Sequence, residues 1–133
     1  MSVRSWHVVD IALPQRDEVL ALFAQVFGGA MAPDLWHWKY GDGRGLATGT
    51  RSDDGRLLAH YGGTARTLLV ARQPMAGVQL GDVMVAQDVR GILSRRGPFA
   101  TAARGFLERH VGSEGGAACG FGFPNDRHAR LGE

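Results

Sequence analysis

The stretch from Leu80 to Leu107 constrains the fold of this chain most, because it combines a strand, a turn and a helix. Leu80 to Val85 is short and apolar and contains β-branched valines, which predicts a buried strand. From Pro98 to Val111 the apolar residues recur at helical spacing, and the proline suits the first turn of a helix. A strand that leads into a helix in this way indicates an α/β or α+β domain.

The turn between this strand and this helix is rich in arginine and glycine. It contains Arg90, Gly91, Arg95, Arg96 and Gly97. The guanidinium groups, the free backbone N–H groups and the positive end of the helix dipole would converge there, which suits a phosphate or pyrophosphate group. An ordinary surface loop of an arginine-rich protein is the alternative, and the residues alone leave both interpretations open.

The segment VMVAQDVRG within this stretch resembles a motif of the GNAT superfamily of acetyl-CoA-dependent acyltransferases. That motif, L-x-V-x-P-x-x-R-G, ends the fourth strand of the GNAT fold and begins its pyrophosphate loop. Val83 and Val85 match its apolar positions, and Arg90-Gly91 matches its Arg-Gly pair. Two features differ: Gln87 stands where proline is common, and the loop is longer than the usual R-G-x-G-x-G/A, with Arg96-Gly97 resuming it.

This resemblance implies a GNAT-type mixed, mostly antiparallel sheet flanked by helices. It implies that acetyl-CoA is the co-substrate, without a metal, and that an acetyl group passes to a small-molecule or peptide amine by direct attack on the thioester. A catalytically inactive CoA-binding or dimerisation module of the same fold is the alternative. The implied cofactor-binding residues are Val83 and Val85 for the pantetheine arm, Arg90, Gly91, Arg95, Arg96, Gly97 and Phe99 for the pyrophosphate, and Asn125 nearby.

Asp82 is the first candidate for the general base, because it is the only acid in the central strand. A structural carboxylate whose hydrogen bonds are satisfied is the alternative. The other titratable candidates are weaker: His37 and His60 have no partners at metal-ligand spacing, which favours structural roles.

The first half of the chain predicts a strand from Val3 to Leu13 and a helix that begins at Pro14 and ends at Gly28-Gly29. The buried stripe of that helix is expected to comprise Val19, Leu20, Leu22, Phe23, Val26 and Phe27. The aromatic segment from Pro33 to Tyr40 predicts a short helix. It is either a hydrophobic plug that closes the core, which we favour, or a wall of the acceptor pocket. Its W-x-W-K-Y sequence also resembles one branch of GNAT-like proteins.

The middle of the chain predicts a meander of antiparallel strands. Leu46 to Arg51 and Arg56 to Gly63 form two strands around a turn at Asp53-Asp54-Gly55. Leu68 to Ala71 continues or follows the second of these strands. A further turn from Arg72 to Gly77 then leads into the central strand.

The C-terminal part predicts a strand from Ala117 to Phe123 that pairs in parallel with Leu80–Val85, and a last helix that starts at Pro124. We interpret the chain as a single GNAT-like domain, residues 1–133, truncated within its fourth helix and without its C-terminal strands. We therefore expect it to lack the tyrosine that often serves as general acid in the family, to transfer acetyl groups poorly on its own, and to form homodimers or aggregates through an exposed strand edge.

Composition excludes several other classes of protein. Cys119 is the only cysteine, which excludes an internal disulfide, and we expect it to be a small buried hydrophobic residue. No apolar run is long enough to span a membrane and no signal peptide is apparent, so we expect a cytoplasmic protein. The formal net charge of +2 is weak for a nucleic-acid-binding protein, and no aromatic residues interleave with the arginine cluster.

Overall fold

The structure, a computed structural model, describes residues 5–92, 94–112 and 116–122 of the 133-residue chain. Its strands are β1 (Trp6–Asp10), β2 (Gly45–Ser52), β3 (Leu57–Val70), β4 (Gln73–Val85) and β5 (Cys119–Phe121). They form one sheet in the order β1-β2-β3-β4-β5, in which β1 to β4 pair antiparallel and β5 pairs parallel with β4. The expected mixed, mostly antiparallel sheet is therefore confirmed.

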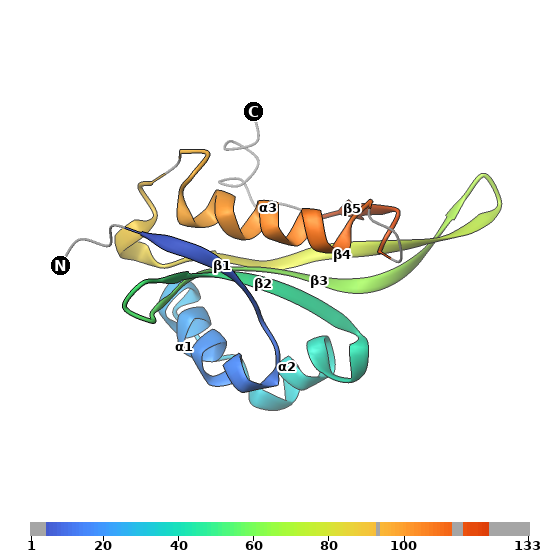
Figure 1. The fold of residues 1–133 in the computed structure, drawn as a ribbon. Helices are drawn as coiled ribbons and strands as arrows, with labels where there is room; N and C mark the ends of the chain where they lie inside the picture. Colours follow the sequence, from blue (N-terminus) through green and yellow to red (C-terminus); the bar gives the residue numbers. More distant parts are fainter. Residues whose placement is uncertain (1–4, 93, 113–115, 123–133) are drawn as a thin grey trace.

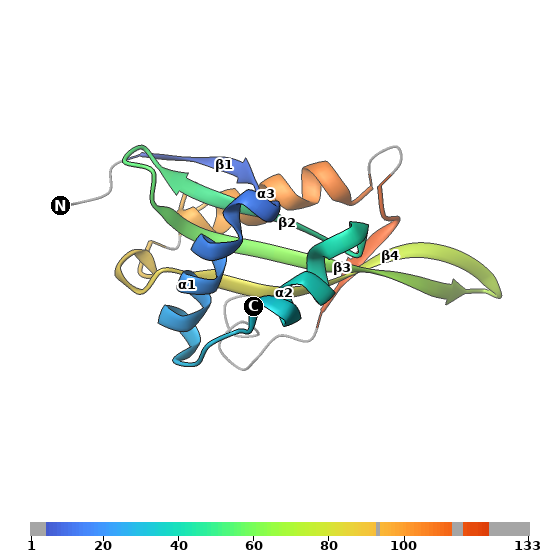
Figure 2. The same ribbon diagram turned by 90° about the horizontal axis from the view of Figure 1, so that it is seen from below.

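Helices cover both faces of this sheet (Figures 1 and 2). The helices α1 (Arg16–Phe27) and α2 (Pro33–Tyr40) lie on one face, and α3 (Pro98–His110) lies on the other. Three short 3-10 turns complete the described structure: η1 (Leu13–Gln15), η2 (Gly41–Gly43) and η3 (Gln87–Val89). Within the described residues, no helix is long and apolar enough to cross a membrane.

The main hydrophobic core lies between the sheet and the helices α1 and α2. Its buried residues are Val19, Leu22, Met31, Trp36, Leu57, Leu58, Met84, Ala86 and Val89. The stripe expected for α1 is confirmed for Val19 and Leu22, with Leu20, Phe23 and Val26 packed partly against the core. The expectation for Phe27 is wrong. It is the last residue of the helix, it is 49% exposed, and its ring contacts Phe23 instead.

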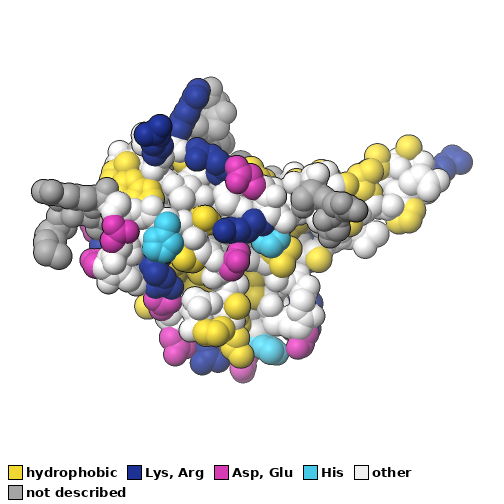
Figure 3. Space-filling model, viewed as in Figure 1, with side chains coloured by type: hydrophobic (Ala, Val, Ile, Leu, Met, Phe, Trp, Pro, Cys, Tyr) yellow, Lys and Arg dark blue, Asp and Glu magenta, His cyan; other side chains and the backbone are white. Residues whose placement is uncertain are grey.

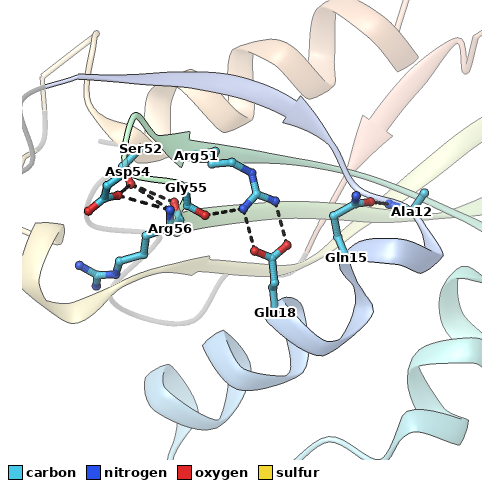
Figure 4. Close-up of polar contacts among 8 residues, drawn as sticks. All are labelled: Ala12, Gln15, Glu18, Arg51, Ser52, Asp54, Gly55 and Arg56. Atoms are coloured by element: carbon cyan, nitrogen blue, oxygen red, sulfur yellow. Dashed lines mark hydrogen bonds and ion pairs between the residues drawn. The ribbon is translucent and has the colours of Figure 1, made fainter.

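An ion pair between Arg51 and Glu18 ties α1 to β2 (Figure 4). The two terminal nitrogens of Arg51 lie 2.7 and 2.8 Å from the two carboxylate oxygens of Glu18, and Nη1 also donates to the carbonyl of Gly55 at 2.7 Å. The hydrogen bond from Arg51 lowers the pKa of Glu18. The same view shows the turn at Asp53-Asp54-Gly55, where Ser52 contacts both Asp54 and Arg56, so the expected hairpin turn is confirmed.

On the opposite face, α3 is fixed to β2 by two buried threonine hydroxyls. Thr50 Oγ1 donates to the carbonyl of Pro98 at 2.7 Å, and Thr48 Oγ1 donates to that of Ala102 at 2.8 Å. Two residues of a strand span about 6.6 Å and four residues of a helix span about 6 Å, so the two spacings match. The first turns of α3 therefore run along β2, which fixes the position of the N-terminus of this helix.

Replacing Thr50 with valine should lower the free energy of unfolding by about 0.5–1.5 kcal/mol, because the hydroxyl–carbonyl bond to Pro98 is lost while that carbonyl keeps its donor within the helix. Thr50→Ser keeps the hydroxyl and is the matched control. Chemical denaturation of the three proteins measures the effect. Equal stability of the valine and serine variants would show that this hydrogen bond does not hold α3 in place.

Strands β3 and β4 form one long hairpin that projects beyond the sheet (Figure 1). The two turn residues are Ala71 and Arg72, whose φ angles of 49° and 68° are typical of the tight turns that match the twist of a hairpin. The expected turn from Arg72 to Gly77 is therefore wrong. Pro74 and Gly77, which suggested that turn, lie within β4, because the tight turn comes before them.

Two further strand expectations need correction. The first strand is confirmed only as Trp6–Asp10, since Leu13 lies in η1 and residues 3 and 4 lie outside the described residues. The parallel pairing of β4 and β5 is confirmed, but Cys119–Phe121 pairs with Gly77–Gln79 and not with Leu80–Val85. Cys119 is half-buried. Phe123 and the expected last helix from Pro124 lie outside the described residues.

Candidate active site

A β-bulge interrupts β4 at Asp82 and Val83. Gly81 pairs with Gly62 of β3 and Met84 pairs with His60, so three steps along β4 oppose two steps along β3. Asp82 and Val83 have no partner in this register, and Asp82 has a φ angle of 50°, in the left-handed region. A bulge leaves ladder groups unpaired and redirects side chains, and bulges are enriched beside active sites. The bulge therefore marks this part of β4 as the candidate site.

The carboxylate of Asp82 receives hydrogen bonds from two side chains of α2. Lys39 Nζ lies 3.1 Å from each of its oxygens, and the hydroxyl of Tyr40 donates to Oδ2 at 2.5 Å. The side chains of Asp82 and Lys39 are 13% and 27% exposed, so this ion pair is only partly screened by solvent. Burial, and then the charge of Asp82, raises the pKa of Tyr40 well above its usual range, which keeps the phenol protonated as a donor.

A hydrogen bond from His60 holds the backbone of Asp82 in place. Nδ1 of this buried histidine lies 2.8 Å from the carbonyl oxygen of Asp82. A carbonyl only accepts, so Nδ1 carries the hydrogen. Gly62 leaves the space in which these groups meet, because a Cβ there would lie 2.4 Å from the Tyr40 hydroxyl and 3.0 Å from the ring of His60. These contacts fit the structural role expected for His60.

Burial lowers the pKa of His60 below its usual 6.5. The unfolded chain then takes up a proton at a higher pH than the folded protein, so the free energy of unfolding should fall as the pH decreases through 6.5 toward the folded pKa. His60→Asn does not titrate and should lose less stability over this range, while His110, whose pKa is also lowered by burial, is present in both proteins. Equal losses in the two proteins would contradict this assignment.

A pocket of about 170 Å³ opens beside the Asp82 carboxylate. We call it the Asp82 pocket, and it is lined by Trp38, Lys39, Tyr40, Gly63, Thr64, Arg66, Gln79, Leu80, Gly81 and Asp82. The aromatic segment from Pro33 to Tyr40 was expected to be either a hydrophobic plug or a pocket wall, and each of its two tryptophans fits one of these roles. Trp36 is buried in the core as the hydrophobic plug, whereas Trp38 is 65% exposed and forms a wall of the pocket.

The loop between η3 and α3 is folded tightly onto the protein. The indole nitrogen of Trp6 donates to the carbonyl of Arg96 at 2.8 Å, and Arg104 donates to that of Arg95 at 2.5 Å. Gly97 is buried at the N-cap of α3, where a Cβ would lie 2.4 Å from the carbonyl oxygen of Ile92. Only glycine fits this close approach, so the loop geometry depends on Gly97.

Positive charge gathers over this loop and the start of α3 (Figure 3). Within the described residues, the guanidinium groups of Arg90, Arg95 and Arg96 have no ion pair or side-chain hydrogen bond. The N–H groups of the first helical turn also lack acceptors within the helix, and the helix dipole places partial positive charge there. This loop can therefore bind an anion.

The loop and the bulge lie at the same end of the sheet. Thr50, which bonds the first turn of α3, pairs with Ala59, and Ala59 pairs with Val85 at the end of β4. Neighbouring strands lie about 4.8 Å apart, and Thr50 is two strands away from Val85. The start of α3, which covers Thr50, is therefore roughly 10 Å from Val85 across the sheet.

The end of β4 and the loop after it thus lie at one end of the sheet, but the carboxylate of Asp82 bonds to α2, on the face opposite α3. Two further expected residues need qualification. The ring of Phe99 packs on Tyr61, with the ring centres 6.2 Å apart, so its side chain is committed to packing. Asn125 lies outside the described residues. Lys39 and Tyr40 were missed as partners of Asp82, and only their place in the aromatic segment hinted at a role.

A larger groove of about 680 Å³ shares Arg66 with the Asp82 pocket and lies between the C-terminal end of α3 and the base of the β3–β4 hairpin. Leu46, Met75, Val78 and His110 are among the residues that line it. It contains neither Asp82 nor any residue of the loop before α3. Size alone therefore does not identify the candidate site.

Compared with protein-family models and with curated proteins, the sequence has no significant match. Solved structures do match its fold. A GCN5-related N-acetyltransferase from Kribbella flavida matches with a TM-score of 0.62 and 27% identity over 80% of this chain, which covers 27% of that protein's chain. This chain has the fold of the GCN5-related N-acetyltransferases.

Two acetyltransferase structures with lower sequence identity show the same fold. An aminoglycoside acetyltransferase from an uncultured soil metagenomic sample has a TM-score of 0.67 and 18% identity, and the match covers 92% of this chain and 82% of that one. Glucosamine-6-phosphate N-acetyltransferase from Arabidopsis thaliana has a TM-score of 0.65 and 10% identity, with 98% and 92% covered. The GNAT fold confirms the resemblance carried by VMVAQDVRG and supports acyl transfer in general.

Proposed function

We propose that this chain is an acyl-CoA-dependent N-acyltransferase that transfers an acetyl group from acetyl-CoA to an amine. The bulge in β4 carries this proposal. It places a carboxylate beside a pocket, and after the short turn η3 the chain enters an arginine-rich loop and a helix N-terminus. A small-molecule or peptide amine is the acceptor that we propose.

The described residues fit the chemistry of CoA at two places. The pantetheine arm carries amide groups, and β5 pairs only with Gly77–Gln79, so the edge of β4 beyond Gln79 has no strand partner among the described residues. The N–H and C=O groups of such an edge, including those of Val83 and Val85, suit an extended amide chain. The arginines of the loop, whose guanidinium groups are unpaired among the described residues, suit the pyrophosphate.

The proposed mechanism assigns proton transfer to Asp82. The amine enters the Asp82 pocket as an ammonium ion, and Asp82 accepts a proton from it, directly or through a water molecule. The neutral amine then attacks the thioester carbonyl, the carbon–sulfur bond breaks, and a proton of the attacking amine passes to the departing CoA thiolate. We assign the polarisation of that carbonyl to a backbone N–H group at the bulge, where Asp82 and Val83 have no partner in the β3–β4 register.

One observation favours the alternative, a CoA-binding module without catalysis. Asp82 is already paired with Lys39 and Tyr40, as a structural carboxylate would be. An acceptor ammonium must displace Lys39 for Asp82 to act as a base. The two functions differ in turnover and not in CoA binding.

Thiol release tests the proposal. The protein is incubated with acetyl-CoA and a panel of amines, and free CoA is measured over time while calorimetry follows acetyl-CoA binding. Amine-dependent release supports the transferase. Binding without release supports the inactive module, and the absence of both contradicts a CoA site.

A further inference from the structure

Lys39 is the single lysine of this chain, which also contains 14 arginines. Its ammonium group lies 3.1 Å from both oxygens of Asp82, and its side chain is 27% exposed where it lines the Asp82 pocket. The one primary amine on a side chain of this protein thus contacts the carboxylate that is proposed to deprotonate an acceptor amine.

The backbone around Lys39 is fixed on both sides. Trp36, one turn earlier in α2, is buried in the core, and the Tyr40 hydroxyl is bonded to Asp82. Arg44 donates to the carbonyls of Trp38 and His37 at 2.7 and 3.0 Å, which holds the end of the helix. The lysine side chain, which is partly exposed, is the part of this segment that is free to turn toward β4. A reactant held in this way needs no bimolecular encounter.

We propose that Lys39 is an internal acceptor, which the protein acetylates at Nζ with its own bound acetyl-CoA. This inference rests on the proposed function. A new Nζ–carbon bond forms and the carbon–sulfur bond of the thioester breaks. Of the three protons of the ammonium group, one passes through Asp82 to solvent, one remains on the new amide, and one protonates the departing CoA thiolate.

Acetylation would also change the pocket. An acetylated lysine is uncharged and cannot form the ion pair with Asp82, which would retain Tyr40 as its donor. The modification would therefore remove the cation that competes with an added amine for Asp82.

Mass spectrometry after incubation with acetyl-CoA tests this inference, and a protease that cuts after lysine gives a second readout because Lys39 offers the only such site. We expect one acetyl group on Lys39, with a first-order rate constant that does not depend on protein concentration. Asp82→Asn should slow the modification at least tenfold. Arg16→Lys supplies a matched control, because it places a lysine beside Asp17, outside the Asp82 pocket.

The outcomes separate the inference from the function on which it rests. Acetylation of Lys39 but not of the lysine introduced at position 16 supports the inference. Equal acetylation of both, or an observed rate constant that rises in proportion to protein concentration, overturns it. If added amines are acetylated while Lys39 stays unmodified, the inference fails and the proposed function stands. If acetyl-CoA does not bind, both fail.

Discussion

Replacing Asp82 with asparagine should slow acetyl transfer by about two to four orders of magnitude, the usual contribution of a positioned general base. Asparagine suits this test because it tolerates the left-handed backbone that Asp82 adopts. It also keeps a side-chain oxygen for Tyr40 and Lys39. The loss should therefore appear in kcat, measured by thiol release, with acetyl-CoA affinity unchanged.

Asp17→Asn is the matched control, because Asp17 lies on the exposed first turn of α1 and pairs only with the neighbouring Arg16 among the described residues. It should leave the rate unchanged. Tyr40→Phe removes one donor from Asp82 but leaves the carboxylate, so it should cost far less than Asp82→Asn. A rate for Asp82→Asn within threefold of the unmodified protein would make Asp82 a structural carboxylate.

Replacing both Arg95 and Arg96 with alanine should weaken CoA binding at least tenfold. A hydrogen bond to a charged group contributes about 1.5–3 kcal/mol, and about 1.4 kcal/mol is a factor of ten in affinity. The loop itself should keep its shape, because Trp6 and Arg104 bind the backbone carbonyls of these residues and not their side chains. Calorimetry measures the affinity.

The control for this double variant is Arg16→Ala with Arg72→Ala, which removes the same charge at two places away from the loop. Added salt should weaken binding to the unmodified protein more than to the Arg95 and Arg96 double variant, because exposed ion contacts are screened. Equal affinity of the double variant and the control would show that the pyrophosphate does not bind at this loop.

Local sequence signals were sufficient for much of the fold. The helix that begins at Pro98 follows from its proline and apolar spacing, and the turn at Asp53-Asp54-Gly55 follows from its residue types. The motif around Arg90-Gly91 predicted the GNAT fold. These features depend on residues close in sequence, which is why they could be recognised without coordinates.

The features that were missed depend on contacts between distant residues. The tight turn at Ala71 and Arg72 has no glycine or asparagine to mark it. The pairing of Asp82 with Lys39 joins residues 43 positions apart, and it requires the bulge that directs this carboxylate toward α2. The register of β5 against β4 has the same origin, since no local pattern specifies which part of a long strand a short one will pair with.

The central claim is that acetyl-CoA binds along the open end of β4 and over the loop before α3. Backbone amide NMR of the full chain during titration with acetyl-CoA tests it most directly. The account predicts that the largest shifts occur at Val83, Val85 and the loop that contains Arg95 and Arg96. Shifts confined to the groove between α3 and the β3–β4 hairpin, or no shifts at all, would contradict it.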